Sequence, residues 1–331
     1  MRTKRITLVA ATVSAVVGLM LHPAVATAAP SDTDPPMGLM IQVSTLAGAV
    51  SPAGLKVWLD EIRSDHHSSA RSGFVNTVVL QDIADTNGAL YTSYLDVLAP
   101  FLPGGATPIF SKAYVGTVDL PWTGQGSKYI DGIEDPAFQT RNLDTSRSAA
   151  ASFVARYPRS VIDWYVTYEA NLSGFWDVNL EGAYRSYLQR LMSRLSGIRA
   201  HRAFLWSPAF WTPYSSEPSW GTSALAANLG DLFTRVPVPL SLALQDMVGQ
   251  SGGTETPVTA VEWVRYLKGR WSSKLASVQI NAEQFTDAPD GAFTAGSANA
   301  VSGRLQYYAS NSISLGPAWE IRYWHQRIYG S

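Results

Sequence analysis

The sequence has no cysteine, few charged residues and, beyond its amino-terminal segment, no apolar run long enough to span a membrane. Without cysteine the chain has no disulfide, no thiolate nucleophile and no cysteine-ligated zinc, so its stability must rest on a sizeable hydrophobic core. Charged residues make up 15% of the chain, and its formal net charge is -1. Because no run of Lys or Arg follows the amino-terminal segment, neither nucleic acid nor an anionic membrane surface is expected as a partner.

Motifs that hold cofactors or metals are also missing. The phosphate-binding patterns GxGxxG and GxxxxGK[ST] do not occur, so we expect no nucleotide cofactor. His66 and His67 are adjacent, His201 and His325 are isolated, and no HExxH spacing occurs, so no metal site is expected. The sequence therefore predicts a protein that folds without cofactor or metal, as a monomer.

The amino terminus has the pattern of a secretory signal peptide. The basic residues of MRTKR precede the apolar stretch ITLVAATVSAVVGLML, which is shorter than the roughly 20 residues of a membrane span. Ala26, Thr27 and Ala28 provide an A-x-A cleavage site. We expect removal of residues 1–28 and secretion of residues 29–331; an uncleaved membrane anchor is the alternative.

Short apolar segments alternate with amphipathic helical segments along the mature chain, as in parallel strands joined by helices. The segments predicted as strands are 38–43, 75–82, 108–114, 161–169, 203–208, 240–245, 278–283 and 319–324. The segments predicted as helices are 51–64, 89–101, 145–157, 180–198, 222–236, 256–271 and 299–310. A doubly wound open sheet has the same local pattern, but eight such units favour a single α/β domain with the (β/α)8 TIM-barrel fold.

Two glutamates end predicted strands whose inward faces are polar. In VIDWYVTYE, alternation directs Trp164 and Tyr168 toward the helices and Glu169 into the barrel, at the carboxyl end where barrel active sites lie. In VQINAE the same alternation directs Glu283 inward. Two carboxyl groups flanking a glycosidic bond can protonate the leaving oxygen and attack the anomeric carbon or activate water. Glu169 and Glu283 are therefore predicted as catalytic, with ion pairing or loop capping as the structural alternative.

Other polar and aromatic side chains lie near the predicted strand ends. Amide and acid groups there can hydrogen-bond the hydroxyl groups of a carbohydrate, and the candidates are Gln42, Asp82, Gln245, Asp246 and Glu320. The chain also has 11 Trp and 15 Tyr, whose flat rings with one polar group suit the faces of sugars. Some of these rings are expected to stack on sugars and the others to anchor loops. The aromatic candidates are Trp122, Trp176, Trp206, Trp211 and Tyr214.

A competing motif occurs in residues 249–253, where GQSGG matches the nucleophile pattern G-x-S-x-G. Asp287 and His325 follow Ser251 in the chain order of an α/β-hydrolase triad, so a serine hydrolase is an alternative reading. Two features oppose it. The nucleophile should pass directly into a helix, whereas GGTETP intervenes, and no HGG-type oxyanion stretch precedes Ser251.

Four segments, WYVTYEAN, FLWSPAFW, LALQDMVG and VQINAEQF, resemble in order and spacing a bacterial domain family of unknown function, regarded as glycoside-hydrolase-like TIM barrels. In that family the fourth strand ends in Trp-Tyr…Glu, the fifth leads into Ser-Pro-aromatic, the sixth ends in Gln-Asp-x-x-Gly and the seventh carries Glu before Phe. The resemblance extends from about Gly38 to Tyr323. It implies a barrel whose pocket is built around Glu169, Gln245, Asp246 and Glu283.

A fold-level analogy assigns the two glutamates their roles. In the larger clan of retaining glycoside hydrolases, strand four carries the acid/base and strand seven the nucleophile, which implies the same roles for Glu169 and Glu283 and a retaining reaction. That clan usually has Asn directly before the strand-four acid. Here Tyr168 precedes Glu169, and Asn171 follows it two positions later.

Two hypotheses of different class follow for the mature protein. The first is an exported glycoside hydrolase that cleaves a poly- or oligosaccharide, with Glu169 and Glu283 as its carboxyl pair. The second is a non-catalytic carbohydrate-binding barrel that keeps the aromatic cleft without competent carboxylates. Both take a carbohydrate as the ligand, and the geometry of the carboxyl groups distinguishes them.

Replacing Ser251 with alanine tests the serine-hydrolase alternative. Because Ser251 is expected to be a turn residue, Ser251→Ala should leave the rate of carbohydrate hydrolysis nearly unchanged in a steady-state assay. A fall of several orders of magnitude would instead support the triad of Ser251, Asp287 and His325.

Overall fold

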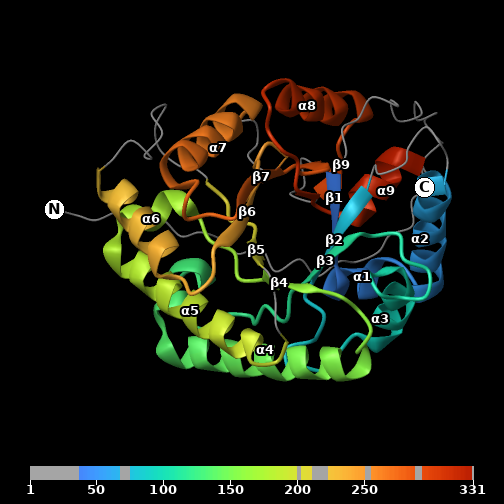
Figure 1. The fold of residues 1–331 in the computed structure, drawn as a ribbon, viewed down its shortest axis with the longest axis horizontal. Helices are drawn as coiled ribbons and strands as arrows, with labels where there is room; N and C mark the ends of the chain where they lie inside the picture. Colours follow the sequence, from blue (N-terminus) through green and yellow to red (C-terminus); the bar gives the residue numbers. More distant parts are fainter. Residues whose placement is uncertain are drawn as a thin grey trace.

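Eight parallel strands form a nearly closed barrel surrounded by helices (Figure 1). The computed structural model describes residues 37–67, 75–199, 203–210, 223–249, 255–287 and 293–329. In barrel order the strands are β10 (Pro317–Ala318), β1 (Met37–Gln42), β2 (Val75–Gln81), β3 (Lys112–Val115), β4 (Asp163–Val166), β5 (Phe204–Trp206), β6 (Leu240–Gln245) and β7 (Ser277–Asn281). The predicted TIM-barrel fold is confirmed.

Helices occupy the connections between the strands. They are α1 (Val43–Ala49), α2 (Pro52–His67), α3 (Thr92–Leu98), α4 (Pro136–Arg156), α5 (Val178–Ser196), α6 (Ser223–Arg235), α7 (Pro257–Trp271), α8 (Ala298–Ser310) and α9 (Ile321–Tyr329). Shorter elements are the 3-10 helices η1 (Ala99–Phe101) and η3 (Leu172–Trp176), the π-helix η2 (Lys128–Gly132), and an antiparallel hairpin of β8 (Phe285–Asp287) and β9 (Phe293–Ala295). In the part of the chain described, no helix combines the length and apolar character needed to cross a bilayer.

The barrel closes through its shortest strand. Gly38 and Leu39 of β1 pair with Pro317 and Ala318 of β10 in parallel register. On the other side, isolated parallel bridges join Ile280 to Leu315 and Glu283 to Trp319. The seam between β7 and β1 is thus held by few backbone hydrogen bonds.

Apolar side chains form two layers, one on each face of the sheet. The outer layer, between strands and helices, includes Trp164, Val166 and Tyr168 from the β4 segment and Val278 and Ile280 from β7. The alternation predicted for these two strands is confirmed. The inner layer fills the barrel, and Trp319 packs against it. Its members are Met40, Val79, Tyr114, Tyr165, Leu205 and Ala243.

The carboxyl-terminal segment of the barrel differs from the sequence prediction. The eighth strand, predicted at 319–324, is the pair Pro317–Ala318, and α9 begins at Ile321. Because the buried residues Ile321, Trp324 and Ile328 recur at helical spacing, this aromatic-rich segment is a helix rather than a strand.

The fourth helix also starts earlier than predicted. It begins at Pro136 instead of residue 145, because the Asp135 carboxylate accepts hydrogen bonds from the N–H groups of Ala137 and Phe138. The predicted Thr256 cap is confirmed, since its hydroxyl accepts a hydrogen bond from the Thr259 N–H at the start of α7.

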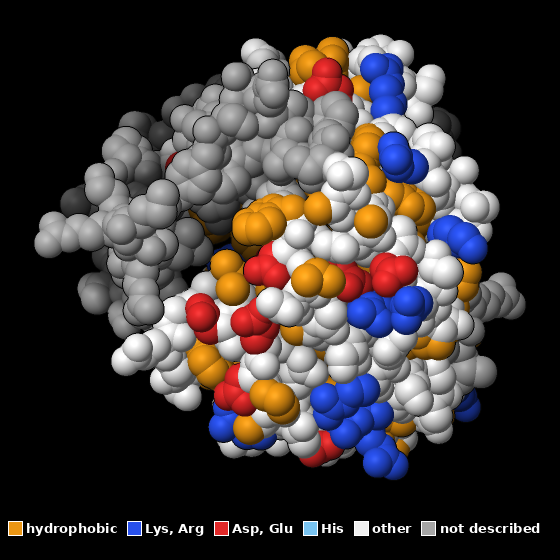
Figure 2. All heavy atoms as spheres, turned by 90° about the vertical axis from the view of Figure 1, so that its left-hand side faces the viewer, with side chains coloured by type: hydrophobic (Ala, Val, Ile, Leu, Met, Phe, Trp, Pro, Cys, Tyr) orange, Lys and Arg blue, Asp and Glu red, His pale blue; other side chains and the backbone are white. Residues whose placement is uncertain are grey.

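The surface agrees with the low net charge. On the face of the molecule around α5 and α6, acidic and basic side chains are interspersed among polar and apolar ones (Figure 2). Opposite charges mixed in this way give no extended field of one sign over the visible, described part of this face.

Gly116 sets the spacing between β3 and β4. Its N–H donates to the Leu80 carbonyl, and a Cβ atom there would lie 2.5 Å from Thr167 Cγ2 and 2.8 Å from Tyr165 Cδ1. Because distances this short require the β4 segment to move, Gly116→Ala is expected to lower the free energy of unfolding by about 1–3 kcal/mol. Denaturant unfolding measures the change.

A second glycine provides the control for this substitution. Gly269 lies in α7, and a Cβ atom there would meet no atom within 4 Å. Gly269→Ala should therefore stabilise the protein by about 0.5–1 kcal/mol through helix propensity. Equal effects of the two substitutions would contradict the close approach at Gly116.

Candidate functional site

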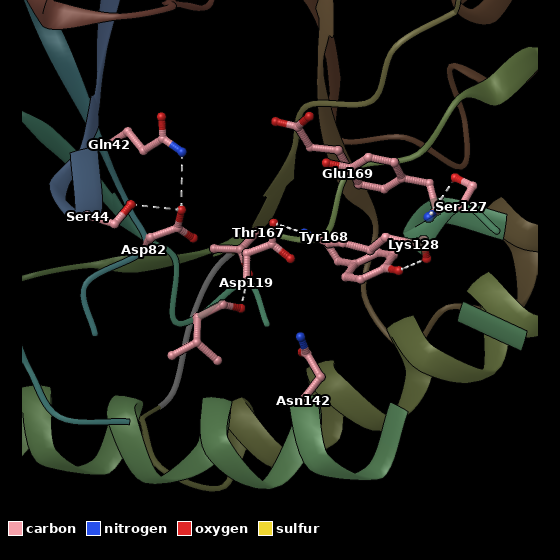
Figure 3. Close-up of polar contacts among 12 residues, drawn as sticks. Gln42, Ser44, Asp82, Asp119, Ser127, Lys128, Asn142, Thr167, Tyr168 and Glu169 are labelled. Atoms are coloured by element: carbon pink, nitrogen blue, oxygen red, sulfur yellow. Dashed lines mark hydrogen bonds and ion pairs between the residues drawn. The ribbon is translucent and has the colours of Figure 1, made fainter. Parts of the chain in front are cut away.

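Polar side chains from several strands meet at the carboxyl end of the barrel. Figure 3 shows Gln42 and Asp82 on one side and Glu169 on the other, with Asp119 between them in this view. Gln42 ends β1, Asp82 follows β2, and Asp119 and Glu169 lie shortly beyond β3 and β4. This end of the barrel is where the connections after the strands can build a binding site.

Asp82 is a buried carboxyl group with neutral partners. Its backbone has a φ of 54°, in the left-handed region that Asp tolerates better than most residues, which turns the chain sharply after β2. Oδ2 accepts hydrogen bonds from Gln42 Nε2 and Ser44 Oγ, each at 3.3 Å. Burial and the nearby Asp119 carboxylate raise the pKa of Asp82 to about 7, against a weaker opposing effect of the Gln42 hydrogen bond.

Glu169 is half-buried at the end of the β4 segment. Burial raises its pKa to about 7, and a hydrogen bond with the Gln245 side chain acts in the opposite direction. The Asp119 carboxylate raises the pKa further, while Lys128 and the Gln81 side chain lower it. Near neutral pH Glu169 is therefore present in both its acid and its ionised form, as a proton donor requires.

Asp119 and Lys128 form an ion pair beside these groups, and the sequence analysis did not identify either residue. The Lys128 ammonium contacts Asp119 Oδ2 and lies 5.2 and 5.5 Å from the ring centroids of Tyr129 and Tyr168. Lys128 begins the π-helix η2, and the Tyr168 hydroxyl donates to its carbonyl. The available signal was the length of the loop after the third strand, in which both residues lie.

Glu283 lies at the end of β7 with its side chain buried. Its Oε2 accepts a hydrogen bond from the Gly249 N–H at 2.7 Å. Gln245 pairs in register with Asn281. Because residues two apart share a face, Glu283 is the next residue after Asn281 on the inward face, nearer the carboxyl end of the barrel. Asp82, Asp119 and Glu169 act electrostatically on one another.

Asp246 does not have the ligand-binding role predicted for it. Its side chain is fully buried, and Oδ2 accepts a hydrogen bond from the Tyr308 hydroxyl and pairs with Arg304 Nε at 3.3 Å. Oδ1 accepts hydrogen bonds from the N–H groups of Glu283 and Val248. Because both oxygens are engaged with α8 and the neighbouring backbone, this carboxylate fastens α8 to the barrel.

Glu320 is the other rim acid and is also fully buried. Oε2 accepts a hydrogen bond from Arg322 Nε at 2.5 Å, and burial raises the carboxyl pKa despite this cation. Oε1 has no hydrogen-bond partner among the described residues. Glu320 follows Trp319, whose half-buried indole rests on the inner apolar layer and was not among the predicted site residues.

The predicted aromatic residues lie in different places. Trp206 is fully buried in the outer layer, and its Nε1 donates to the Tyr168 carbonyl, so the prediction that it stacks on a sugar is wrong. Trp122 packs edge-on against Phe138 and donates to the Gln125 carbonyl, which anchors the loop after β3. Trp176 is 61% exposed and available to a ligand. Trp211 and Tyr214 lie outside the described residues.

Of the residues named for a serine-hydrolase triad, the structure describes Asp287 and His325. Ser251 lies outside the described residues, and Gly249 occupies the turn after β6. His325 belongs to α9, where its Nε2 lies 2.6 Å from the Glu61 carboxylate and its ring stacks on Trp58, both of α2. The imidazole is thus held between two helices of a barrel, not beside the strand-to-helix turn of an α/β-hydrolase. In the described part of the chain, no group of three or more His, Asp or Glu is arranged to hold a metal ion.

Comparison with known proteins identifies the fold. No protein-family model matches the chain, and no curated protein matches it in sequence. Its structure is similar to that of a Bacteroides thetaiotaomicron protein assigned as an alpha-L-fucosidase, with a TM-score of 0.59, 12% identity, and coverage of 91% of this chain and 92% of the other.

Two xylanases align less closely. They are TsXylA, an intracellular enzyme from Thermoanaerobacterium saccharolyticum, and XynB from Paenibacillus barcinonensis, each with a TM-score of 0.48. The identities are 13% and 11%, over 86% and 87% of this chain and 85% and 84% of the xylanases. At 12% identity the likeness to the Bacteroides protein shows the barrel fold alone.

Replacing Asp82 with asparagine tests the burial of its carboxyl group. Its pKa is raised from 3.8 to about 7, so the folded state holds the proton more tightly than the unfolded chain. This contribution is complete below about pH 4 and is lost as the pH rises through about 7. Asp82→Asn cannot ionise and keeps the shape, so it should stabilise the protein at pH 8 by about 1–2 kcal/mol, or roughly 2–6 °C in melting temperature.

Thermal unfolding at pH 4 and pH 8 makes the comparison, and little difference between the two proteins is expected at pH 4. Asp144→Asn is a matched control, because the Asp144 side chain is 63% exposed on α4. An equal stabilising effect of Asp82→Asn at both pH values would show that ionisation of Asp82 is not its cause.

Proposed function

We propose that this protein is an exported glycoside hydrolase that cleaves a poly- or oligosaccharide, with Glu169 as the proton donor. The observation that carries the proposal is the state of Glu169, a half-buried carboxyl group at the carboxyl end of β4 whose pKa is raised to about 7. Departure of an alcohol from the anomeric carbon needs such an acid. The barrel fold shared with known glycoside hydrolases agrees with this activity.

Glu283 is proposed as the second carboxyl group of the reaction. It follows β7, whose inward-facing residues it continues, and β7 is the third strand after β4 in the barrel. Gln245, at the end of the intervening strand β6, hydrogen-bonds Glu169. The Gly249 N–H donates to Glu283 Oε2 at 2.7 Å and holds this carboxyl group in place. In a retaining reaction this carboxylate attacks the anomeric carbon, Glu169 protonates the departing oxygen, and water then releases the sugar with Glu169 as base.

The remaining groups at the barrel mouth suit a hydroxyl-rich ligand. Gln42 and Gln245 present amide groups at the ends of β1 and β6, and Glu320 Oε1 and the Trp319 Nε1–H are buried without a hydrogen-bond partner among the described residues. The flat indole of Trp319 lies on the inner apolar layer, where a sugar face can stack on it. These residues are proposed to hold the carbohydrate while the two glutamates act on the bond.

Conservative substitution of the glutamates tests the mechanism. Glu169→Gln should lower kcat on a natural oligosaccharide by about 10²–10⁴, because it removes the proton donor and keeps the shape of the side chain. Glu283→Gln should lower kcat at least as much by removing the nucleophile. An aryl glycoside with an activated leaving group should restore the first step of the Glu169 variant but not of the Glu283 variant. Affinity, measured by calorimetry, should change little in either.

The pH profile gives an independent measurement of the same acid. Since Glu169 acts while protonated, kcat/KM of the wild type should fall as the pH rises through about 7, and this limb should be absent from Glu169→Gln. Glu262→Gln, at an exposed position of α7, is the control and should behave as the wild type. Wild-type turnover by both site variants would contradict the two-glutamate mechanism, and binding without turnover by the wild type would favour the non-catalytic barrel.

A further inference from the structure

Acidic groups outnumber cations at the carboxyl end of the barrel. Asp82, Asp119 and Glu169 converge there from the ends of three consecutive strands (Figure 3). Among the described residues, Lys128 is the cation whose charge reaches both Asp82 and Glu169, and its ammonium is committed to Asp119. The site therefore has an excess of negative charge whenever Asp82 and Glu169 are ionised together.

Asp82 is the carboxyl group least compensated by the protein. The residue is 7% exposed, and the donors on its Oδ2 are the neutral groups of Gln42 and Ser44. Its Oδ1 is buried and has no hydrogen-bond partner among the described residues. A buried carboxylate with an unpaired oxygen and no cation in direct contact is costly, so it either takes up a proton or meets a cation supplied by a ligand.

Three tyrosines lie within electrostatic range of these carboxyl groups. Tyr91 and Tyr165 lie near enough that the charge of Asp82 contributes to raising the pKa of each phenol. The charges of Glu169 and Asp119 likewise contribute to raising the pKa of the Tyr129 phenol, and its ring lies beside the Lys128 ammonium. Carboxylates combined with ring faces are the chemistry that binds an ammonium group, since the rings add cation–π attraction to the charge-assisted hydrogen bond.

We propose that the carbohydrate bound at this site is an amino sugar with a free ammonium group, and that this group binds Asp82 Oδ1 at the end of β2. The inference rests on the proposed function in taking a carbohydrate as the ligand, and it adds the substrate class. A neutral sugar hydroxyl can donate to Oδ1 but leaves its charge uncompensated. An N-acetylated sugar also lacks the charge, and a uronic acid would be repelled by the three carboxylates.

The test compares carbohydrates that differ only in the group on one carbon. Tetramers of glucosamine and of galactosamine are each paired with their N-acetylated and their neutral, hydroxyl-bearing counterparts. Calorimetry with the purified protein at pH 7 measures affinity, and product analysis measures cleavage. At least one amine-bearing tetramer should bind about tenfold to a hundredfold more tightly than both counterparts, the range expected for a hydrogen bond between charged groups.

Substitution of Asp82 assigns the preference to this residue. Asp82→Asn keeps the shape and the Gln42 and Ser44 hydrogen bonds while removing the charge, so it should lower affinity for the amine-bearing tetramer to that of its neutral counterpart. Affinity for the neutral tetramer should fall much less, because the amide group can still hydrogen-bond a hydroxyl. Asp144→Asn, exposed on α4, should retain the wild-type preference.

Binding and cleavage separate the failure of this inference from that of the hydrolase proposal. Tight binding of an amine-bearing tetramer without cleavage would support the inference and contradict the hydrolase. Cleavage of a neutral or N-acetylated tetramer in preference to both amine-bearing ones would support the hydrolase and overturn the inference. If neither amine-bearing tetramer binds at least tenfold more tightly than its counterparts, or if Asp82→Asn keeps the preference, the inference is wrong.

Discussion

The burial of carboxyl groups with too few cations beside them is the constraint on which the site depends. The pKa values of Asp82 and Glu169 are each raised to about 7, chiefly because burial removes their carboxyl groups from water, and the Asp119 carboxylate adds to both shifts. Lys128 offsets part of this charge but is held by Asp119. A group of acids arranged in this way exchanges protons near neutral pH, which suits a proton donor and also makes the site receptive to positive charge.

The free-energy cost of these buried acids is offset by the large apolar core of the rest of the barrel. Two layers of buried side chains lie on the two faces of one sheet, and the inner layer includes residues that precede the acids along the same strands. The charge of Asp246, which is fully buried, is instead compensated within the protein. Asp246 is paired with Arg304 and hydrogen-bonded on both oxygens, so its burial joins α8 to the barrel rather than creating a reactive group.

The sequence predicted those features that depend on local periodicity. Alternation along β4 and β7 correctly separated the outward residues, such as Trp164 and Ile280, because a side chain's face follows directly from its position in a strand. Features that depend on distant contacts could not be predicted in this way. The pairing of Lys128 with Asp119 depends on the path of a long loop, and the burial of Asp246 depends on a helix that comes much later in the chain.

Errors at the eighth strand and at Trp206 have related causes. A two-residue strand has too few positions to show a period, so the apolar helix after Ala318 resembled a strand. Trp206 lies within the strand predicted at 203–208, and it was expected to meet a sugar because it is near the end of that strand; in the structure its ring packs on the outward face of β5. Where aromatic residues are this abundant, composition alone does not separate core rings from those that meet a ligand.

The short strand β10 also determines the order in which the barrel can be completed. β1 is among the first elements of the described chain to be made, yet its second neighbour is Pro317–Ala318, close to the end of the described residues. Until those residues are available, one edge of an apolar parallel sheet has free N–H and C=O groups. Closing the barrel joins segments very far apart in sequence, which is slow because of the chain entropy lost. During this interval the edge of β1 is a site for pairing between chains, and a folding pathway that shields it protects the protein from aggregation.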